Sequence, residues 1–115
     1  MPEYILLLHE DPATFASYSP EEIQNVISRY KNWRESLVSR GLQPGGKKLR
    51  DGAGRVMRGR GAKLRVADGP YSEAREVIGG FFTFTAASFD EAVEVSKDCP
   101  HLEFGTIEIR EVEET

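Results

Sequence analysis

The chain has 115 residues with a formal net charge of −4, and 39% of its residues are hydrophobic. This length corresponds to a single domain, residues 1–115, with a core of modest size. The acidic balance excludes a general attraction to nucleic acid or to an anionic membrane. The one cysteine, Cys99, excludes an internal disulfide. Together with the lack of a signal-peptide pattern and of an apolar run near 18 residues, it predicts a cytoplasmic protein.

The first forty residues predict a strand followed by a long helix. Residues 4–9 form a short apolar run, which is typical of a strand buried on both faces at the centre of a sheet. Ser19, Pro20 and Glu22 provide a helix cap, a proline at the first helical position and the glutamate of a capping box. Apolar side chains then recur at steps of three and four, and Gly41 ends the helix. This apolar stripe consists of Ile23, Val26, Ile27, Tyr30, Trp33, Leu37 and Val38.

The middle of the chain combines glycine-rich turns with β-prone segments. Three short pieces, residues 47–50, 55–57 and 63–67, lie between turn signals and predict the strands of a twisted hairpin. After a further turn and a charged connector, residues 77–86 are rich in phenylalanine and threonine. This composition predicts another strand that is apolar on both faces.

A second helix and a final strand complete the predicted fold. Ser88 and Glu91 have the spacing of a second capping box, and Pro100 after Cys99 stops this helix. Residues 103–112 alternate between apolar and polar side chains, which indicates a strand with one buried face. The inner face of the helix is predicted to consist of Phe89, Ala92, Val93 and Ser96.

The order of these elements is β-α-β-β-α-β, which is the split βαβ, or ferredoxin-like, arrangement of an α+β protein. We therefore predict an antiparallel sheet with two helices on one face. The first and third main strands lie at its centre and the last lies at an edge. The central strands keep apolar residues on the face without helices, and such a face is an interaction surface. A second copy related by a two-fold axis is its simplest cover, so we predict a homodimer.

Residues 68–82 form the most distinctive segment, because a turn, a charged connector, two glycines and an aromatic strand follow one another within it. The two glycines by themselves predict a β-bulge or a close approach by another backbone or a ligand. The segment resembles the YCII-related family, specifically the branch named for its DGPF motif, which typically reads D-G-P-F-A-E-T-K-E before a G-G aromatic strand. The matching residues are Asp68, Gly69, Pro70, Glu73, Glu76, Gly79 and Gly80, and the resemblance covers nearly the whole chain.

The resemblance implies a dimeric α/β barrel built on the ferredoxin-like fold. It also implies a candidate small-molecule enzyme in which a helix histidine is paired with an aspartate. Asp68 corresponds to that aspartate, but the first helix of this chain contains no histidine. Members of the DGPF branch often accompany extracytoplasmic sigma factors, which implies a regulatory or accessory role.

His9 and Asp68 are the candidate catalytic residues. A histidine at the end of the first strand can reach a cleft and titrate near neutral pH, although a partly exposed strand-end histidine without a function is the simpler interpretation. Asp68 can act with His9 as a base and its orienting partner. An aspartate before Gly-Pro also bonds its own downstream backbone, and this turn chemistry favours a structural role. His101 follows Pro100 in a loop and is predicted to be solvated.

Tyr30, Trp33, Tyr71 and Phe82 are the candidate walls of a small-molecule pocket near Asp68 and the first helix. Aromatic residues at such spacing also form cores and dimer interfaces, and this alternative stays open. Cys99 has the sequence context of an inert thiol. The sequence has no metal-ligand cluster, no phosphate-binding loop and no dinucleotide fingerprint, so we expect neither a metal nor a cofactor.

Residues 47–65 contain eight Lys or Arg and one acid, a net charge of +7, so the rest of the chain carries −11. A basic segment attracts anionic ligands or nucleic acid. Because it lacks an aromatic residue for base stacking, a solvated hairpin is favoured over nucleic-acid binding. The sequence therefore predicts a small dimeric protein that binds a small molecule, with an enzymatic activity left open. The alternative is a non-enzymatic regulatory or scaffold module.

Overall fold

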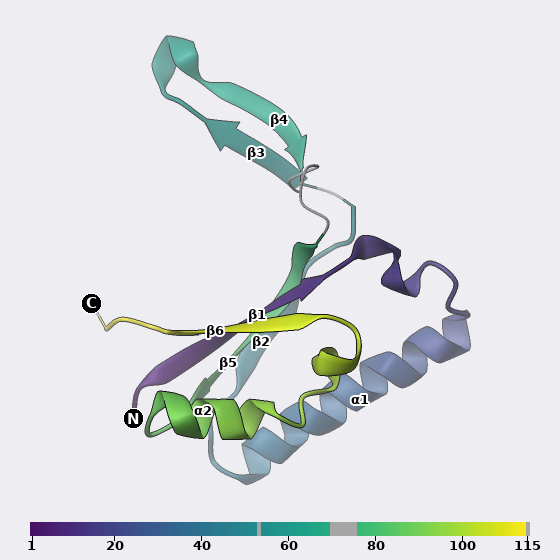
Figure 1. Ribbon diagram of the computed structural model, residues 1–115, viewed down its shortest axis with the longest axis vertical. Coiled ribbons are helices and arrows are strands. Elements are labelled where there is room, and N and C mark those ends of the chain that lie inside the picture. Colours follow the sequence, from purple (N-terminus) through teal and green to yellow (C-terminus); the bar gives the residue numbers. More distant parts are fainter. Residues whose placement is uncertain (53, 70–75, 115) are drawn as a thin grey trace.

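The computed structural model describes residues 1–52, 54–69 and 76–114. Strand β1 is followed by the long helix α1, three short strands, the long strand β5, helix α2 and strand β6 (Figure 1). Short 3-10 turns follow β1, join β3 to β4 and precede β6. The bounds are β1 Glu3–Glu10, α1 Pro20–Ser39, β2 Gly45–Lys48, β3 Gly54–Arg58, β4 Arg65–Gly69, β5 Val77–Thr85, α2 Phe89–Ser96 and β6 Thr106–Glu111.

The main sheet has four antiparallel strands in the order β2-β5-β1-β6. Strands β1 and β5, the first and third main strands, lie at its centre and β6 lies at an edge. Side chains of β1 alternate between a buried face and a half-buried face. The buried face packs on Trp33 and Leu37 of α1 and on Ala92 and Val95 of α2. Both helices therefore cover one face of the sheet, which confirms the predicted ferredoxin-like α+β fold.

Helix α1 has the predicted ends. The Ser19 hydroxyl accepts a hydrogen bond from the Glu22 amide at 3.1 Å, and the Glu22 carboxylate accepts one from the Ser19 amide at 2.9 Å. At the other end Gly41 adopts a φ of 71°. The amides of Gly41 and Leu42 donate to the carbonyls of Val38 and Leu37, which satisfies the last turn of the helix.

Helix α2 differs from its prediction in two respects. The Ser88 hydroxyl caps the Glu91 amide at 3.2 Å, but the Glu91 carboxylate accepts from the Ala87 amide, so the reciprocal capping box does not form. The inner face consists of Ala92, Val95 and Ser96, whereas Phe89 and Val93 are exposed. The helix is rotated relative to the prediction. Its inner stripe includes Val95 and continues to the buried Cys99, whereas Ala92 and Ser96 belong to both the predicted and the observed face.

The glycine-rich region also differs from its prediction. Strand β2 leaves the predicted hairpin and pairs with β5 in the main sheet. Gly46 permits this pairing, since a Cβ atom there would lie 2.4 Å from the Phe81 carbonyl oxygen. Strands β3 and β4 form a separate two-stranded sheet, which projects away from the main sheet and the helices (Figure 1). The final strand is shorter than predicted, because Glu103 lies in the 3-10 turn Pro100–Glu103 and the strand begins only at Thr106.

The face of the main sheet opposite the helices carries Ile5 and Leu7 of β1, which pair with Thr83 and Phe81 of β5. All four residues are half-buried within the single chain. We call this surface the open sheet face. Within the described residues, no helix has both the length and the apolar character needed to cross a membrane.

Candidate functional site

The predicted catalytic residues Asp68 and His9 lie in different parts of the fold. Asp68 belongs to β4 of the projecting hairpin, where its side chain is 92% exposed and lies 3.3 Å from the Arg55 guanidinium. His9 belongs to β1, where its Nε2 atom lies 3.0 Å from the Glu108 carboxylate of β6. Within the described residues each side chain therefore has its own partner and no contact joins the two. A joint catalytic role stays a prediction.

Three of the four predicted pocket residues pack together between α1 and the sheet. Trp33 lies edge-on to Phe82 with ring centroids 5.1 Å apart, and Tyr30 stacks on Phe82 at 6.3 Å. The Trp33 indole also donates to the Asp98 carboxylate at 2.9 Å. These rings fill the helix-covered core, and their role as pocket walls stays a prediction. The fourth residue, Tyr71, lies outside the described residues, as do most positions of the DGPF motif.

His101 is buried, with 1% of its surface exposed, so the expectation of a solvated loop histidine was wrong. Its Nε2 atom lies 2.9 Å from the His9 carbonyl oxygen, which can only accept a hydrogen bond. Nε2 therefore carries a proton, and in the neutral ring Nδ1 accepts from the Tyr30 hydroxyl at 3.0 Å. Gly105 makes room for this arrangement, since a Cβ atom there would lie 2.9 Å from His101 Nε2. Burial raises the pKa of Tyr30 well above its usual range.

Glu10 is the functional candidate that the sequence analysis missed. It ends β1 on the helix-covered face, one alternation step beyond the core residues Leu6 and Leu8, and only 8% of its surface is exposed. The sequence did contain a signal for this position. Alternate residues of a strand face the same side, so the pattern of Leu6 and Leu8, extended by two residues, places the Glu10 carboxylate on the core face. The negative charge of Glu10 also contributes to the raised pKa of Tyr30.

A β-bulge in β5 provides the space for the Glu10 carboxylate. The register of β1 and β5 changes between Leu8, which pairs with Gly80, and His9, which pairs with Ile78. Gly79 is therefore the extra residue, which confirms the β-bulge, one of the two alternatives predicted for the two glycines. A Cβ atom on Gly79 would lie 1.7 Å from Glu10 Oε1. The Glu10 carboxylate can therefore occupy its observed position only because residue 79 is a glycine.

Glu10 borders a cleft of about 240 Å³ at the junction of the main sheet and the projecting hairpin. We call it the Glu10 cleft. Arg50 and Arg55 contribute two cationic side chains, and Leu49, Val77 and Ile78 contribute apolar surface. The cleft therefore combines the carboxylates of Asp51 and of the largely buried residue Glu10 with two guanidinium groups. Such a site can bind a small molecule that carries both a hydrogen-bond donor and an acidic group.

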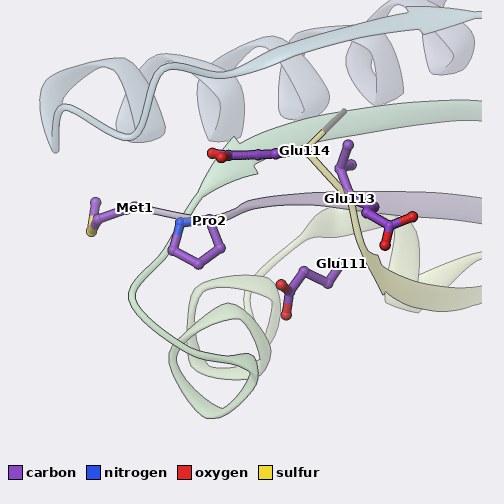
Figure 2. Close-up of a pocket in the computed structure, with 6 residues that line it drawn as sticks. Met1, Pro2, Glu111, Glu113 and Glu114 are labelled. Carbon is purple, nitrogen blue, oxygen red and sulfur yellow. The ribbon is translucent and has the colours of Figure 1, made fainter.

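A second cleft of about 550 Å³ lies at the opposite end of the main sheet. Glu111, Glu113 and Glu114 surround it together with Met1 and Pro2 (Figure 2). We call it the terminal cleft. Its lining combines three carboxylates with apolar surface. The described residues contain no group of three or more His, Cys, Asp or Glu side chains arranged to hold a metal ion.

The fold and the Glu10 cleft define a ferredoxin-like α+β protein with a small polar cleft where the central strands meet the projecting hairpin. The chain belongs to the YCII-related family, whose domain it matches over residues 3–115. This match does not separate the branches of the family, so assignment to the DGPF branch stays a prediction.

Individual proteins similar to this chain include one from Rhizobium meliloti and one from Arabidopsis thaliana. An uncharacterized protein of Rhizobium meliloti (strain 1021) is 28% identical over 96 residues, which cover 83% of this chain and 77% of that protein. The crystal structure of At3g17210 from Arabidopsis thaliana aligns with 100% of this chain and 96% of its own, at 14% identity and a TM-score of 0.45. The family membership therefore comes from the domain match and the fold from the strand order described above.

Proposed function

We propose that this YCII-related protein binds a small molecule in the Glu10 cleft. The ligand carries an amine or hydroxyl group that donates to Glu10 and an acidic group that faces Arg50 and Arg55. The sequence predicted a cleft near Asp68 and the first helix. The Glu10 cleft borders Arg55, the ion-pair partner of Asp68, whereas its described lining includes no residue of α1.

The observation that carries this proposal is the position of the Glu10 carboxylate. A carboxylate on the core face of a strand costs free energy unless its charge is compensated, and an apolar side chain would continue the pattern of β1 at lower cost. The chain instead accommodates it with a bulge and a glycine. Local departures of this kind concentrate at functional sites.

The size and charge of the cleft limit the ligand. A volume of about 240 Å³ is smaller than most sites for drug-sized ligands, which occupy roughly 300–1,000 Å³. Two guanidinium groups match a carboxylate or phosphate. Small zwitterions such as α-amino acids satisfy both ends of the cleft and are therefore suitable first probes.

A thermal-shift screen tests this proposal with three panels: α-amino acids, the corresponding carboxylic acids without an amine, and the corresponding amines without an acid. At about ten times Kd, a bound compound stabilises the fold by about 1.4 kcal/mol, which raises Tm by several degrees. We expect the shift for amino acids with the wild type and with Glu3→Gln, an exposed control on the same strand. Glu10→Gln is expected to lose it. An equal shift with Glu10→Gln, or no shift in any panel, would refute the proposal.

The same probes separate an enzyme from a regulatory module. Both need the cleft, but only an enzyme converts the bound compound. Proton NMR of each stabilising compound, recorded over hours with the wild type and with Glu10→Gln, distinguishes the two. Conversion that depends on Glu10 indicates an enzyme, whereas binding without conversion supports the regulatory alternative.

We further propose that a second copy covers the open sheet face. Ile5, Leu7 and Phe81 form adjacent apolar positions on it, and a two-fold axis brings two such faces together. Light scattering at micromolar concentration tests this assembly. We expect a dimer for the wild type and for Val93→Glu, which changes an exposed apolar residue of α2, and a monomer for Leu7→Glu. A monomeric wild type would contradict the assembly.

A further inference from the structure

The projecting hairpin, residues 54–69, has apolar surface that the rest of the chain leaves exposed. We call it the basic arm. Within the described residues its strands β3 and β4 pair with each other alone, and isolated two-stranded hairpins have marginal stability in water. Met57 and Val66 form a cross-strand pair, yet they are 64% and 57% exposed. An arm of this kind gains stability when another surface covers this pair.

The charge of the arm identifies the type of surface that fits it. The arm contains five Lys or Arg and one acid, a net charge of +4, so the rest of the chain carries −8. Its tip presents Arg60 and Lys63 as exposed cations. The complementary surface is therefore acidic with an apolar part.

The terminal cleft has this composition. Glu111, Glu113 and Glu114 supply carboxylates, and Met1 and Pro2 lie to one side of them (Figure 2). At about 550 Å³ it is also the larger of the two clefts described above. It therefore offers negative charge and apolar contact together.

The arm and the terminal cleft of one chain lie at opposite ends of the main sheet. The arm leaves the main sheet where Glu10 pairs with Val77, whereas the terminal cleft lies beyond the other end of β1, where Glu3 pairs with Thr85. These ends are about 23 Å apart at about 3.3 Å per residue, and the arm projects away from the sheet (Figure 1). A two-fold axis perpendicular to β1 reverses the strand direction in the second copy. The arm of each copy then lies beside the terminal cleft of the other copy, so two equivalent contacts form.

We propose that the basic arm of each copy docks in the terminal cleft of a second copy. Arg60 and Lys63 then face Glu113 and Glu114, and the Met57–Val66 pair covers Met1 and Pro2. This contact is in addition to the Glu10 cleft and does not require a ligand. It rests on the proposed two-fold homodimer, to which it adds two symmetric contacts.

Charge reversal in pairs tests the contact. One chain carries Arg60→Glu with Lys63→Glu in the arm, and the other carries Glu113→Lys with Glu114→Lys in the cleft. Each chain alone brings like charges together at both contacts, so we expect the Kd of its homodimer to rise at least about tenfold. An equimolar mixture restores opposite charges at both contacts. Native mass spectrometry of the mixture is therefore expected to show predominantly the heterodimer.

The control mixture carries the same number of reversals on the exposed surface of α1. One chain has Lys31→Glu with Arg34→Glu, and the other has Glu21→Lys with Glu35→Lys. It is expected to give homodimers and heterodimers near the statistical ratio of one to two to one. The same ratio for the arm and cleft chains would overturn the proposal.

Two further outcomes separate failure of the arm contact from failure of the homodimer. If Leu7→Glu gives a monomer while both charge-reversed chains dimerise like the wild type, the open sheet face forms the dimer and the arm contact is wrong. If the wild type is monomeric, both are wrong. Fluorescence anisotropy with a labelled 12-nucleotide RNA provides the last check. Salt-sensitive RNA binding that the arm reversal abolishes, with unchanged dimer affinity, would replace the second copy by nucleic acid as the partner.

Discussion

The close contact between Gly79 and Glu10 leads to a quantitative prediction for Gly79→Ala. An added Cβ would lie 1.7 Å from Glu10 Oε1 and 2.7 Å from its Cδ, so the carboxylate must leave its position. The backbone at Gly79 does not have a positive φ, and the clash with Glu10 is therefore the main cost. Overpacking of this kind costs about 1–3 kcal/mol of the free energy of unfolding.

A double-mutant cycle with Glu10→Ala isolates this effect. Without the Glu10 carboxylate, Gly79→Ala meets no clash with that side chain. It is expected to be close to neutral, or to stabilise by up to about 1 kcal/mol through the lower entropy of the unfolded chain. The coupling between the two positions is thus about 1–4 kcal/mol. Urea unfolding followed by the fluorescence of Trp33, at one fixed protein concentration, measures all four variants.

Gly80→Ala is the matched control for this cycle. Its Cβ would lie 2.8 Å from the Lys47 carbonyl oxygen, which is backbone of the neighbouring strand β2. Truncation of Glu10 cannot relieve that clash, so the cost of Gly80→Ala is expected to be the same in both backgrounds. If Gly79→Ala also costs the same in both backgrounds, the bulge does not serve to accommodate Glu10 and the argument for the Glu10 cleft fails.

Three further predictions concern the core and the first helix. Burial raises the pKa of the Cys99 thiol from 9.0 to about 11. Between pH 9 and pH 11 the folded state therefore binds more protons than the unfolded state. The free energy of unfolding consequently falls as the pH rises through this range. Urea unfolding at pH 8 and pH 10.5 is expected to show this loss for the wild type and a smaller loss for Cys99→Ala. Tyr30→Phe leaves the buried Nδ1 of His101 without its donor and is expected to cost about 1–3 kcal/mol, whereas Tyr18→Phe, which changes a half-buried tyrosine, is expected to have little effect in the same assay. Ser19→Ala removes the cap of α1 and is expected to cost about 1 kcal/mol, measured by thermal unfolding.

Elements that are determined by nearby residues were predictable from the sequence. Helix α1 is the clearest case, because its cap, its apolar stripe and Gly41 all lie within 23 residues and agree with one another. The order of the main strands followed from the same kind of pattern. The inner face of α2 was not predictable, since two stripes of equal spacing compete and packing against the sheet selects the one that contains Val95.

The candidate site was less predictable, because its polar residues are buried by partners far away in the sequence. His101 contacts Tyr30 and His9, which precede it by 71 and 92 residues. When only the neighbouring residues in the sequence are considered, a histidine that follows a proline is predicted to be exposed. Glu10 is similar, since a glutamate at the end of an apolar strand normally indicates the start of a loop. Its burial depends on a bulge at Gly79 in another strand.

Asp68 is therefore better understood through Arg55 than through His9. Asp68 pairs with Arg55 across the hairpin, and Arg55 lines the Glu10 cleft. An exposed ion pair contributes only about 0–1 kcal/mol to stability, so Asp68→Asn is expected to leave the urea midpoint almost unchanged. However, Asp68→Asn releases the Arg55 guanidinium from its fixed position. The substitution should therefore weaken the binding of the acidic end of a ligand.

The affinities of the probes that stabilise the wild type test this role of Asp68. Asp68→Asn is expected to reduce affinity for probes that carry an acidic group and to leave affinity for amines without one unchanged. Arg55→Gln should have the same selectivity with a larger effect, since it removes the group that Asp68 positions. An equal loss for both kinds of probe would show that Asp68 acts on the fold of the hairpin and not on the orientation of Arg55. Unchanged affinity for acidic probes would remove Asp68 from the site altogether.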